Sequence, residues 1–371
     1  MEDTVSYSNI HGDWEVRKIP VMGAVKSFVT QLRKGQDLTR ISLPSCFLRP
    51  YSILEEACTR SIGNVDLLID VPEIPTAEER MKQIVKWLLS SGKLENLNHK
   101  PYNPVLGEEH KARYDFEDGK KVFFLAEQVE HHPPVSAFHL ISSNKKLSVE
   151  GNTNFSVTFN GNSVSVNMLG EMRIILKIKN DQGEFTEEVY TFSKCTPDLL
   201  IQNVIIGKKH VVLYGDIFIK CPSTGYSSKL NFDFKNNKSR VKGEIKKDEN
   251  VIYEINGSAV GETLISEKNN RSELLCDASK ARALVPKYPS IIDLASNSSI
   301  LLWSPVTQAI IKNDMITADQ KKNEIEEMQR NLIAEGGFAP KYFENTGDNI
   351  WKVKNPDWFE TSDDVNPDAN K

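Results

Sequence analysis

The chain has 371 residues, of which 39% are hydrophobic and 26% charged, so it has ample apolar material for a large core and is neither disordered nor collagen-like. Its formal net charge is -5, with 46 Lys and Arg against 51 Asp and Glu, which excludes a global positive field that would attract nucleic acid. Any anion-binding site must therefore be a local cluster of basic side chains.

The cysteines and the hydropathy pattern indicate a compartment for the protein. The five cysteines are odd in number and lack CxxC spacing, which argues against a disulfide framework and a structural zinc site. Residues 1–18 are acidic where a signal peptide needs a basic and then an apolar segment. The most apolar long window, residues 291–311, includes Asp293 and Pro305 and is too polar to span a membrane. We therefore expect a soluble, cytoplasmic protein.

The first predicted element is a short amphipathic helix over about residues 20–34, ending near Gly35. Its apolar residues at helical spacing are Val21, Val25, Phe28, Val29 and Leu32. This apolar face must be covered by something. An ordinary helix would pack it against the core, whereas a movable lid would place it over the opening of a pocket. The pattern alone leaves both interpretations open.

A proline-interrupted segment comes next. Leu43-Pro44 opens an apolar stretch that ends at Pro50, and a helical pattern begins near Ser52.

A capping box predicts the next helix. Thr76 and Glu79 have the Ser/Thr-x-x-Glu spacing and precede apolar residues at i, i+3, i+4 and i+7. We predict a helix that begins at Ala77 and ends by Gly92.

From about Val122 to Cys276 the hydrophobic period changes to two, which is typical of half-buried antiparallel strands. The clearest alternations are Phe155/Val157/Phe159, Val164/Val166/Met168, Ile174/Leu176/Ile178, Leu230/Phe232/Phe234 and Val251/Tyr253/Ile255. The breaks carry hairpin residues, at 160–162, 181–183 and 236–237. Roughly ten consecutive strands cannot stay an open flat sheet, so we predict a barrel or sandwich; a barrel of this size can enclose a cavity.

The pattern turns helical again after Lys280. Thr317 and Gln320 have capping-box spacing, and Gly336-Gly337 ends the predicted helix. Its predicted apolar face consists of Ile325, Met328 and Leu332. The last segment is aromatic up to Phe359 and is predicted to be a docked arm followed by a solvated tail.

Two adjacent histidines, His131 and His132, lie in the string EQVEHHPP at the end of a strand-like run. In an extended chain their side chains point to opposite faces and no third ligand follows at helical spacing, so we expect no metal site. The two prolines fix the start of a rigid loop that can present the imidazoles reproducibly. One buried and one exposed structural histidine is the alternative interpretation.

Two further groups could complete an anion site. Lys100 and Asn103 stand three residues apart in a proline-stiffened turn, and Lys322, Glu326 and Arg330 share one helical face at i, i+4 and i+8. Taken singly, these are a turn with a solvated lysine and an intrahelical ion-pair ladder. Together with the two histidines they make a plausible phosphate site of charge-assisted donors.

Several strings resemble the oxysterol-binding-protein-related lipid-transfer family. EQVEHHPPVSAF resembles the family signature EQVSHHPP, and HKPYNPVLGE matches the element KPxNPxLGE. The resemblance continues through Leu43-Pro44, NVIIGK at residues 203–208, Trp303 and KNEIEEMQR at residues 322–330. It covers nearly the whole chain, with one departure, because Glu130 stands where the family has Ser.

The resemblance implies one lipid-binding domain over residues 1–371, mainly β with α. The expected architecture is a large, nearly complete antiparallel β-barrel around a hydrophobic tunnel, with flanking helices. A tail and lid would occupy about residues 1–36, a helical segment about 37–104, the barrel about 105–278, and a C-terminal helical region and tail about 279–371. The lid and tunnel mouth would include the apolar residues of the first helix together with Leu43 and Pro44.

The resemblance also implies a ligand and its site. Matching motif positions assign a phosphatidylinositol 4-phosphate headgroup to Lys100, Asn103, His131, His132, Lys322, Glu326 and Arg330. The second lipid would be sterol more readily than phosphatidylserine, and the two would be exchanged through one tunnel. We expect no cofactor, no metal, no catalytic residue and no nucleic acid, but a transient membrane surface as partner of a monomer. The carboxylate of Glu130 beside two histidines could weaken phosphate binding or raise the histidine pKa values.

Two other classes of function remain open at this point. One is a lipid sensor or scaffold that binds phosphoinositide without net transfer. The other is a hydrolase that uses Glu127 with the two histidines, although no nucleophile elbow or third metal ligand supports it.

Overall fold

The computed structural model describes residues 33–38, 44–91, 99–131, 133–180, 182–267, 270–282, 284–336, 338–347 and 350–360. The predicted lid residues 21–32, Leu43 and His132 lie outside these ranges. Within them, no helix has both the length and the apolar character that a bilayer crossing requires.

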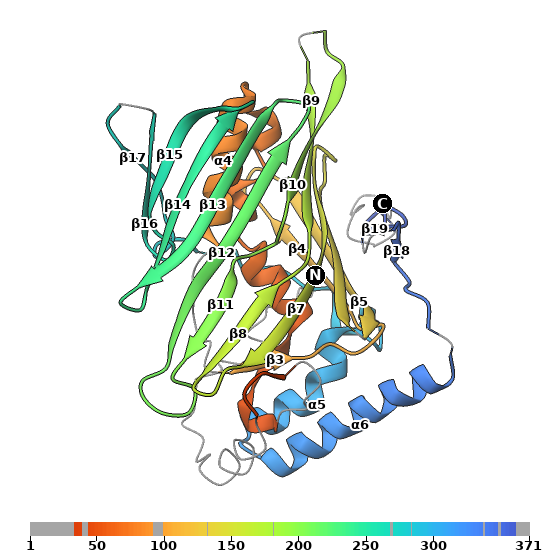
Figure 1. Ribbon diagram of the computed structural model, residues 1–371. Coiled ribbons are helices and arrows are strands. Elements are labelled where there is room, and N and C mark those ends of the chain that lie inside the picture. The colour runs from red at the N-terminus through yellow and green to blue at the C-terminus, as the bar shows by residue number, and fades with distance from the viewer. Residues whose placement is uncertain are drawn as a thin grey trace.

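The fold consists of one large sheet, several helices and short peripheral strands (Figure 1). The strands of the large sheet are β1 (Gln36–Asp37), β4 (Glu109–Asp115), β5 (Lys121–His131), β6 (Pro134–Ser142), β7 (Leu147–Phe159), β8 (Ser163–Met168), β9 (Met172–Lys179), β10 (Phe185–Phe192), β11 (Asp198–Gln202), β12 (His210–Cys221), β13 (Tyr226–Lys235), β14 (Lys238–Lys247), β15 (Asn250–Ser258), β16 (Glu262–Glu267) and β17 (Glu273–Asp277). Two small sheets pair β2 (Leu48–Ser52) with β3 (Lys100–Tyr102) and β18 (Phe343–Asn345) with β19 (Trp351–Val353). The helices are η1 (Ser45–Phe47), α3 (Ile53–Glu56), η2 (Ala57–Ser61), η3 (Val65–Leu67), η4 (Val71–Glu73), α4 (Ala77–Ser90), η5 (Ile291–Asp293), α5 (Ser299–Ile311) and α6 (Met315–Ala334).

The antiparallel sheet confirms the period-two prediction. Each of the five alternating triplets lies in one strand, and the strands β5 to β17 occupy the predicted interval. The hairpins fall at the predicted breaks. Between β13 and β14 both turn residues, Asn236 and Asn237, have positive φ (52° and 59°), as a tight two-residue hairpin requires.

The sheet curls into a ring whose two ends do not pair with each other among the described residues. The path runs from β17 to β4. The free edge of β4 is covered by an irregular segment, through isolated bridges from Glu109 to Ser298 and from Arg113 to Lys287. Covering an edge in this way satisfies its backbone groups and protects it from pairing with another chain. The architecture is thus a curved, incompletely closed sheet, in agreement with the predicted nearly complete barrel.

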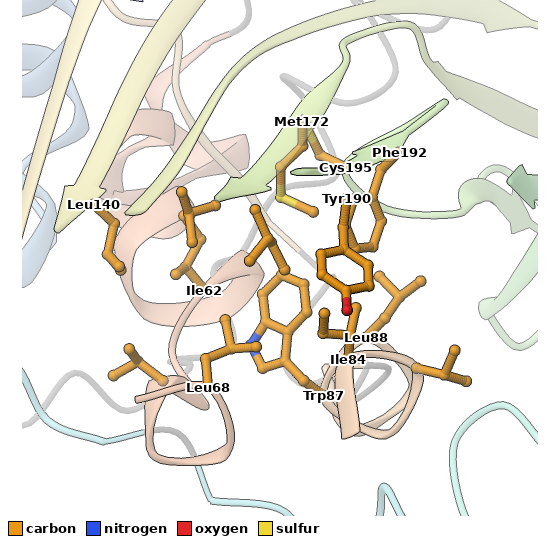
Figure 2. Packing of buried hydrophobic residues seen from close by; sticks show 14 of the residues in the cluster. Ile62, Leu68, Ile84, Trp87, Leu88, Leu140, Met172, Tyr190, Phe192 and Cys195 are labelled. Atoms are coloured by element: carbon orange, nitrogen blue, oxygen red, sulfur yellow. The ribbon is translucent and has the colours of Figure 1, made fainter. Parts of the chain in front are cut away.

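Helix α4 fills one end of this ring. Thr76 caps its first turn by accepting a hydrogen bond from the backbone N–H of Glu79 at 3.2 Å, so the predicted start is confirmed. Its apolar face packs against the inner face of the strands, and Figure 2 shows Trp87 among side chains from β9 and β10. Trp87 meets the Phe192 ring edge-on with centroids 6.2 Å apart. This end of the interior is therefore packed with side chains.

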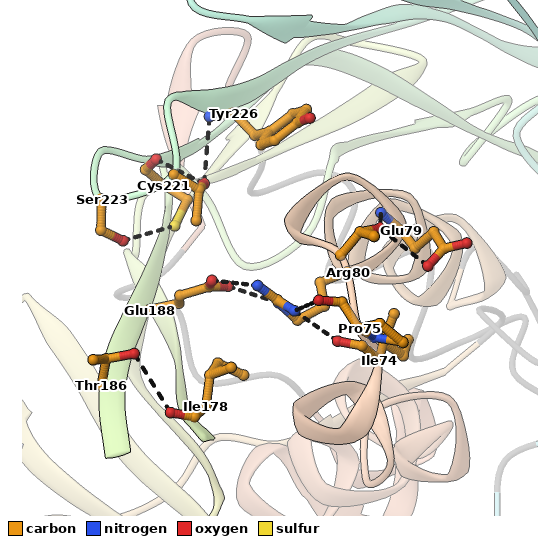
Figure 3. Close-up of polar contacts among 12 residues, drawn as sticks. Ile74, Pro75, Glu79, Arg80, Ile178, Thr186, Glu188, Cys221, Ser223 and Tyr226 are labelled. Atoms are coloured by element: carbon orange, nitrogen blue, oxygen red, sulfur yellow. Dashed lines mark hydrogen bonds and ion pairs between the residues drawn. The ribbon is translucent and has the colours of Figure 1, made fainter. Parts of the chain in front are cut away.

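A buried ion pair fixes α4 to the sheet (Figure 3). The Arg80 guanidinium donates from Nε and Nη2 to the Glu188 carboxylate of β10, at 2.9 and 2.5 Å, and from Nη1 to the carbonyl oxygens of Ile74 and Pro75. The Tyr190 hydroxyl also donates to Glu188, at 2.8 Å. Every strong donor and acceptor in this group is therefore paired, as burial demands.

The last helix differs from its prediction in two ways. Its N-cap is Asp314, which accepts from the N–H of Thr317 at 3.1 Å, so the observed cap lies three residues before the predicted cap Thr317 and the helix begins at Met315. Aspartate is the stronger cap of the two. The buried face is also rotated relative to the prediction, because Met328 is 53% exposed. The buried residues are Ala318, Lys322, Ile325 and Gln329. The helix ends as predicted, with Gly336 in the left-handed region after the C-cap.

The predicted C-terminal arm is docked as far as it is described. Phe359 stacks on Phe123 of β5 with ring centroids 4.7 Å apart. The residues Phe343 and Trp351 of β18 and β19 pack on the outer face of β5 and β6.

Candidate functional site

A pocket of about 970 Å³ lies at the end of the ring away from α4, where α5 and α6 close the molecule below β3 (Figure 1). Six residues that the sequence nominated line it together: Lys100, Asn103, His131, Lys322, Glu326 and Arg330. The seventh, His132, lies outside the described residues, as do Leu43 and the lid residues. Pro44 caps η1 and is not part of the pocket lining.

Strand β3 places Lys100 and Asn103. It pairs in parallel with β2, with Leu48 opposite Lys100. Between the two site residues, the Tyr102 ring stacks on Trp303 of α5 at 4.5 Å, and its hydroxyl shares a 2.9 Å hydrogen bond with Thr307. The stack and the hydrogen bond fix the strand against α5, so the side chains on either side of Tyr102 have a defined direction.

A buried carboxylate, Glu108, holds the turn after Asn103. It accepts hydrogen bonds from Ser52 Oγ (2.5 Å), Ser299 Oγ (2.7 Å), Trp303 Nε1 (2.8 Å) and the backbone N–H of Val105 (3.1 Å). Burial raises the pKa of Glu108, and these four donors oppose the increase. The glutamate of the KPxNPxLGE-like string therefore has a positioning role, since it joins the site turn to α5 and to the segment before α3.

A β-bulge places His131. Leu125 and Glu127 of β5 face the C-terminal arm, and so does Val129, the extra residue of the bulge. The register shifts by one residue between Gln128 and Glu130, and Gln128 Nε2 donates to the carbonyl oxygen of Glu130 at 2.9 Å. One extra residue reverses which face each following side chain takes. His131 consequently lines the pocket instead of facing the arm, and Glu130 is outside the pocket lining.

Helix α6 contributes cationic and amide groups. Lys322 is only 7% exposed and forms an ion pair with Glu326 at 2.6 Å. Burial, and next the charge of Lys322, lower the pKa of Lys100 to about 8. Two ammonium groups that disfavour each other in one enclosed space would be stabilised by an anion between them.

Gln329 was not predicted, although it lies on the same helical face as Lys322 and Glu326. It lines the pocket, is 6% exposed, and its Nε2 has no hydrogen-bond partner among the described residues. The i+3 and i+7 spacing from the two nominated residues could have identified it. Asp37 of β1, which also lines the pocket, carried no signal in the sequence.

The carboxylate of Glu127 binds the backbone of the C-terminal arm. It accepts from the backbone N–H groups of Lys341 and Tyr342 at 2.6 and 2.8 Å, and it is not among the pocket residues. The hydrolase interpretation, which needed Glu127 beside the histidines, is therefore wrong. Among the residues that the structure describes, no group of three His, Cys, Asp or Glu side chains is arranged to hold a metal ion.

Comparison with known proteins shows the family of this chain. The family described as oxysterol-binding protein matches residues 27–362. The chain belongs to this family. Family members bind and transfer lipids and are not enzymes. Relatives include the oxysterol-binding protein-like protein OBPa of Candida albicans, 30% identical over 329 residues, covering 85% of this chain and 74% of the relative. Oxysterol-binding protein 10 of Dictyostelium discoideum is 27% identical over 338 residues and covers 90% and 83% of the two chains.

Solved structures show the same fold. The Osh1 ORD domain in complex with ergosterol has a TM-score of 0.76 at 21% identity, covering 92% of this chain and 88% of that one. The Osh3 ORD of Saccharomyces cerevisiae, in complex with PI(4)P, has a TM-score of 0.68 at 20% identity and covers 91% of each chain. The chain thus has the same overall fold as these domains.

Proposed function

We propose that this protein extracts phosphatidylinositol 4-phosphate from a membrane and exchanges it for a second lipid. The observation that supports the proposal is that six nominated residues from β3, β5, α6 and the turn after β3 line one pocket. The solved relatives add support, since one is a complex with PI(4)P and another a complex with ergosterol.

In this proposal the basic residues bind the phosphate groups. Lys100, Lys322 and Arg330 supply charge, and Asn103 and His131 supply directed hydrogen bonds. Glu326 holds the Lys322 ammonium in place through its ion pair. His132 has the same assignment by its motif position. Gln329 adds an amide donor for a phosphate or hydroxyl oxygen, which would satisfy a group that is otherwise buried without a partner.

Exchange follows from the energetics of a single pocket. Each CH₂ group taken from a bilayer costs about 0.8 kcal/mol unless an apolar surface replaces the membrane. Leu48, Val105 and Trp303 provide apolar wall within the pocket. A volume of about 970 Å³ is the size of a site for one ligand, so two lipids would compete for it. A gradient of one lipid can then drive transport of the other, without nucleotide hydrolysis.

The second lipid in this proposal is sterol ahead of phosphatidylserine, on the support of the relatives solved with ergosterol and cholesterol. The protein would act as a cytoplasmic monomer that touches membranes transiently. Native mass spectrometry of lipid that copurifies from cells distinguishes the two cargoes. A phosphatidylserine mass would reverse the preference.

The proposal predicts that Lys100→Ala and His131→Ala each lower extraction of phosphatidylinositol 4-phosphate from liposomes by about tenfold or more. Each variant removes a charge-assisted or directed hydrogen bond worth roughly 1–3 kcal/mol. Lys242→Ala, an exposed lysine on β14 outside the pocket lining, is the matched control and should extract as the wild type does. Circular dichroism checks that every variant is folded.

Two outcomes would contradict the proposal in different ways. Unchanged extraction by both site variants would refute the headgroup site. Normal lipid binding with no transfer between donor and acceptor liposomes would instead favour a lipid sensor or scaffold.

A further inference from the structure

The turn between β11 and β12 presents apolar side chains to solvent. Ile205 is 44% exposed and Ile206 is 75% exposed, and both Lys208 and Lys209, which follow Gly207, are exposed as well. We refer to Ile205, Ile206, Lys208 and Lys209 as the docking tip. Two neighbouring isoleucines held in water are unfavourable unless something covers them part of the time.

The docking tip is braced in its exposed position by a side chain from another hairpin. Asn162, in the turn between β7 and β8, accepts from the backbone N–H groups of Ile205 and Ile206, both at 3.0 Å. Its amide nitrogen donates to the carbonyl oxygen of Ile206, also at 3.0 Å. Asn203 donates to the carbonyl oxygen of Lys208 at 2.9 Å, and Gly207 takes a φ of +104°. The isoleucines are therefore fixed outward by specific hydrogen bonds.

The docking tip lies on the same end of the molecule as the pocket. Figure 1 shows the turn between β11 and β12 at the end where β3, α5 and α6 meet. Lys209 comes close enough to His99 that its charge, after burial, contributes to lowering the pKa of that imidazole. His99 directly precedes Lys100, which lines the pocket.

We propose that the docking tip inserts Ile205 and Ile206 into the interfacial layer of an anionic lipid bilayer, with Lys208 and Lys209 at the level of the headgroups. The inference rests on the proposed function, because it names the membrane-contacting surface that serves that pocket. A short apolar tip followed by two lysines fits the headgroup boundary, where apolar burial and attraction to anionic lipids add. A tip fixed in advance also loses little conformational entropy when it inserts.

The test measures binding to phosphatidylcholine vesicles with and without phosphatidylserine, by flotation. The double variant Ile205→Ser/Ile206→Ser should lower binding to the phosphatidylserine-containing vesicles by about tenfold or more. Val285→Ser is the matched control, because Val285 is a β-branched residue with 73% exposure that has no exposed apolar neighbour in the described sequence beside it. It should bind as the wild type does.

A second variant tests the charge. Lys208→Gln should weaken binding only when phosphatidylserine is present, and added salt should abolish the difference. Lys208 is chosen because Lys209 stands beside His99 and could affect the pocket directly.

A parallel measurement separates this inference from the proposed function. Binding of water-soluble, short-chain phosphatidylinositol 4-phosphate should be unchanged in the Ile205→Ser/Ile206→Ser variant. The docking-tip proposal would be overturned if that variant bound vesicles as well as the wild type does. It would also be overturned if the wild type did not bind vesicles. Loss of both soluble-lipid and vesicle binding would also overturn it, since the turn would then shape the pocket. If no protein binds the soluble lipid while vesicle binding still depends on the isoleucines, the headgroup proposal fails and the docking tip stands.

Discussion

At the scale of single residues, the pocket brings positive charges into a confined space with few negative ones. Lys100 and Lys322 both line it, and among the described residues the ion pair there joins Lys322 to Glu326. Burial and the neighbouring ammonium lower the pKa of Lys100 from its ordinary value of 10.5 to about 8. An anionic ligand would supply the missing negative charge and favour the protonated lysine again. Ligand affinity and the protonation of Lys100 should therefore be linked.

The linkage predicts that affinity for soluble, short-chain phosphatidylinositol 4-phosphate falls as the pH rises above about 8. Below that pH, Lys100 is already protonated in the empty pocket, so ligand binding requires no additional free energy to protonate it. Above it, binding must take up a proton, so affinity should fall by up to about tenfold per pH unit until the pKa of the bound state is reached. Isothermal titration calorimetry from about pH 7.5 to about pH 9 measures the slope, because this range lies well above the second phosphate pKa of about 6.

Lys100→Arg is the control for this slope. A guanidinium stays protonated throughout the range, so the variant should lose most of the decline in affinity. A wild-type affinity that is flat across the same range would contradict the assignment of Lys100 to the ligand.

The residues of the candidate site could be nominated from sequence because they stand in long motifs or at helical spacing. Their grouping in one pocket could not be derived in this way, since it depends on β3 lying against α5 and α6. Sequence also gave no indication that a bulge near Gln128 turns His131 toward the pocket while leaving Glu127 on the outer face. Such register shifts depend on tertiary pairing and not on local pattern.

At the scale of elements, a histidine of β6 forms a hydrogen bond to the C-terminal arm, in addition to the apolar packing of the arm on β5 and β6. The Trp358 indole N–H donates to His139 Nδ1 at 3.0 Å, and His139 Nε2 lies 2.9 Å from Ser148 Oγ. Because an indole can only donate, Nδ1 must be unprotonated and the neutral ring carries its proton on Nε2. Burial lowers the pKa of His139 to about 4. Protonation of His139 would add a proton to Nδ1, which would then no longer accept the hydrogen bond from the Trp358 indole N–H.

This arrangement predicts that the arm and its contribution to stability are sensitive to acid. The native state binds fewer protons at His139 than the unfolded chain between pH 4 and the ordinary value of 6.5. The stabilisation is therefore complete above about pH 6.5 and is lost as the pH falls, by up to about 3 kcal/mol at pH 4. Urea unfolding at several pH values measures this dependence.

His139→Gln is the informative variant for the arm. It cannot titrate, so its unfolding free energy should decline less steeply than that of the wild type between about pH 6.5 and about pH 5. Equal slopes for the two proteins would show that other groups account for the acid sensitivity.

Element boundaries followed from sequence where local chemistry decides them. The cap at Thr76 and the hairpin at Asn236-Asn237 were identified correctly, because capping and positive φ act within four residues. The start of α6 was misplaced because Thr317 also fits the local capping pattern, although Asp314 is the stronger cap. Met328 was misassigned to the core because the face of α6 is set by the pocket and α5, which place Lys322 and Gln329 inside.

At the scale of the whole molecule, the ring of strands has two differently filled ends. Helix α4 packs one end with side chains, and the pocket lies at the other (Figures 1 and 2). The buried pair of Arg80 and Glu188 joins α4 to β10 within the packed end, with exposures of 5% and 8% (Figure 3). A curved sheet that does not close on itself needs such internal support. We therefore expect loss of this pair to lower the free energy of unfolding of the whole protein and not only to loosen α4.

Removing one partner of this pair should destabilise the protein more than removing both. Arg80→Met leaves the Glu188 carboxylate buried without its cation, which should cost about 3–5 kcal/mol of unfolding free energy. The double variant Arg80→Met/Glu188→Met leaves no unpaired charge and should recover a large part of that loss, although the hydroxyl of Tyr190 loses its acceptor. Arg240→Met provides the matched control, because the Arg240–Asp233 pair has the same bidentate geometry but side chains 40% and 42% exposed, and should cost about 1 kcal/mol or less. Urea denaturation of the wild type, these three variants and the single variant Glu188→Met measures the differences. Additive losses at Arg80 and Glu188 would mean that the two side chains act independently and that apolar packing around Trp87 alone holds α4 inside the ring.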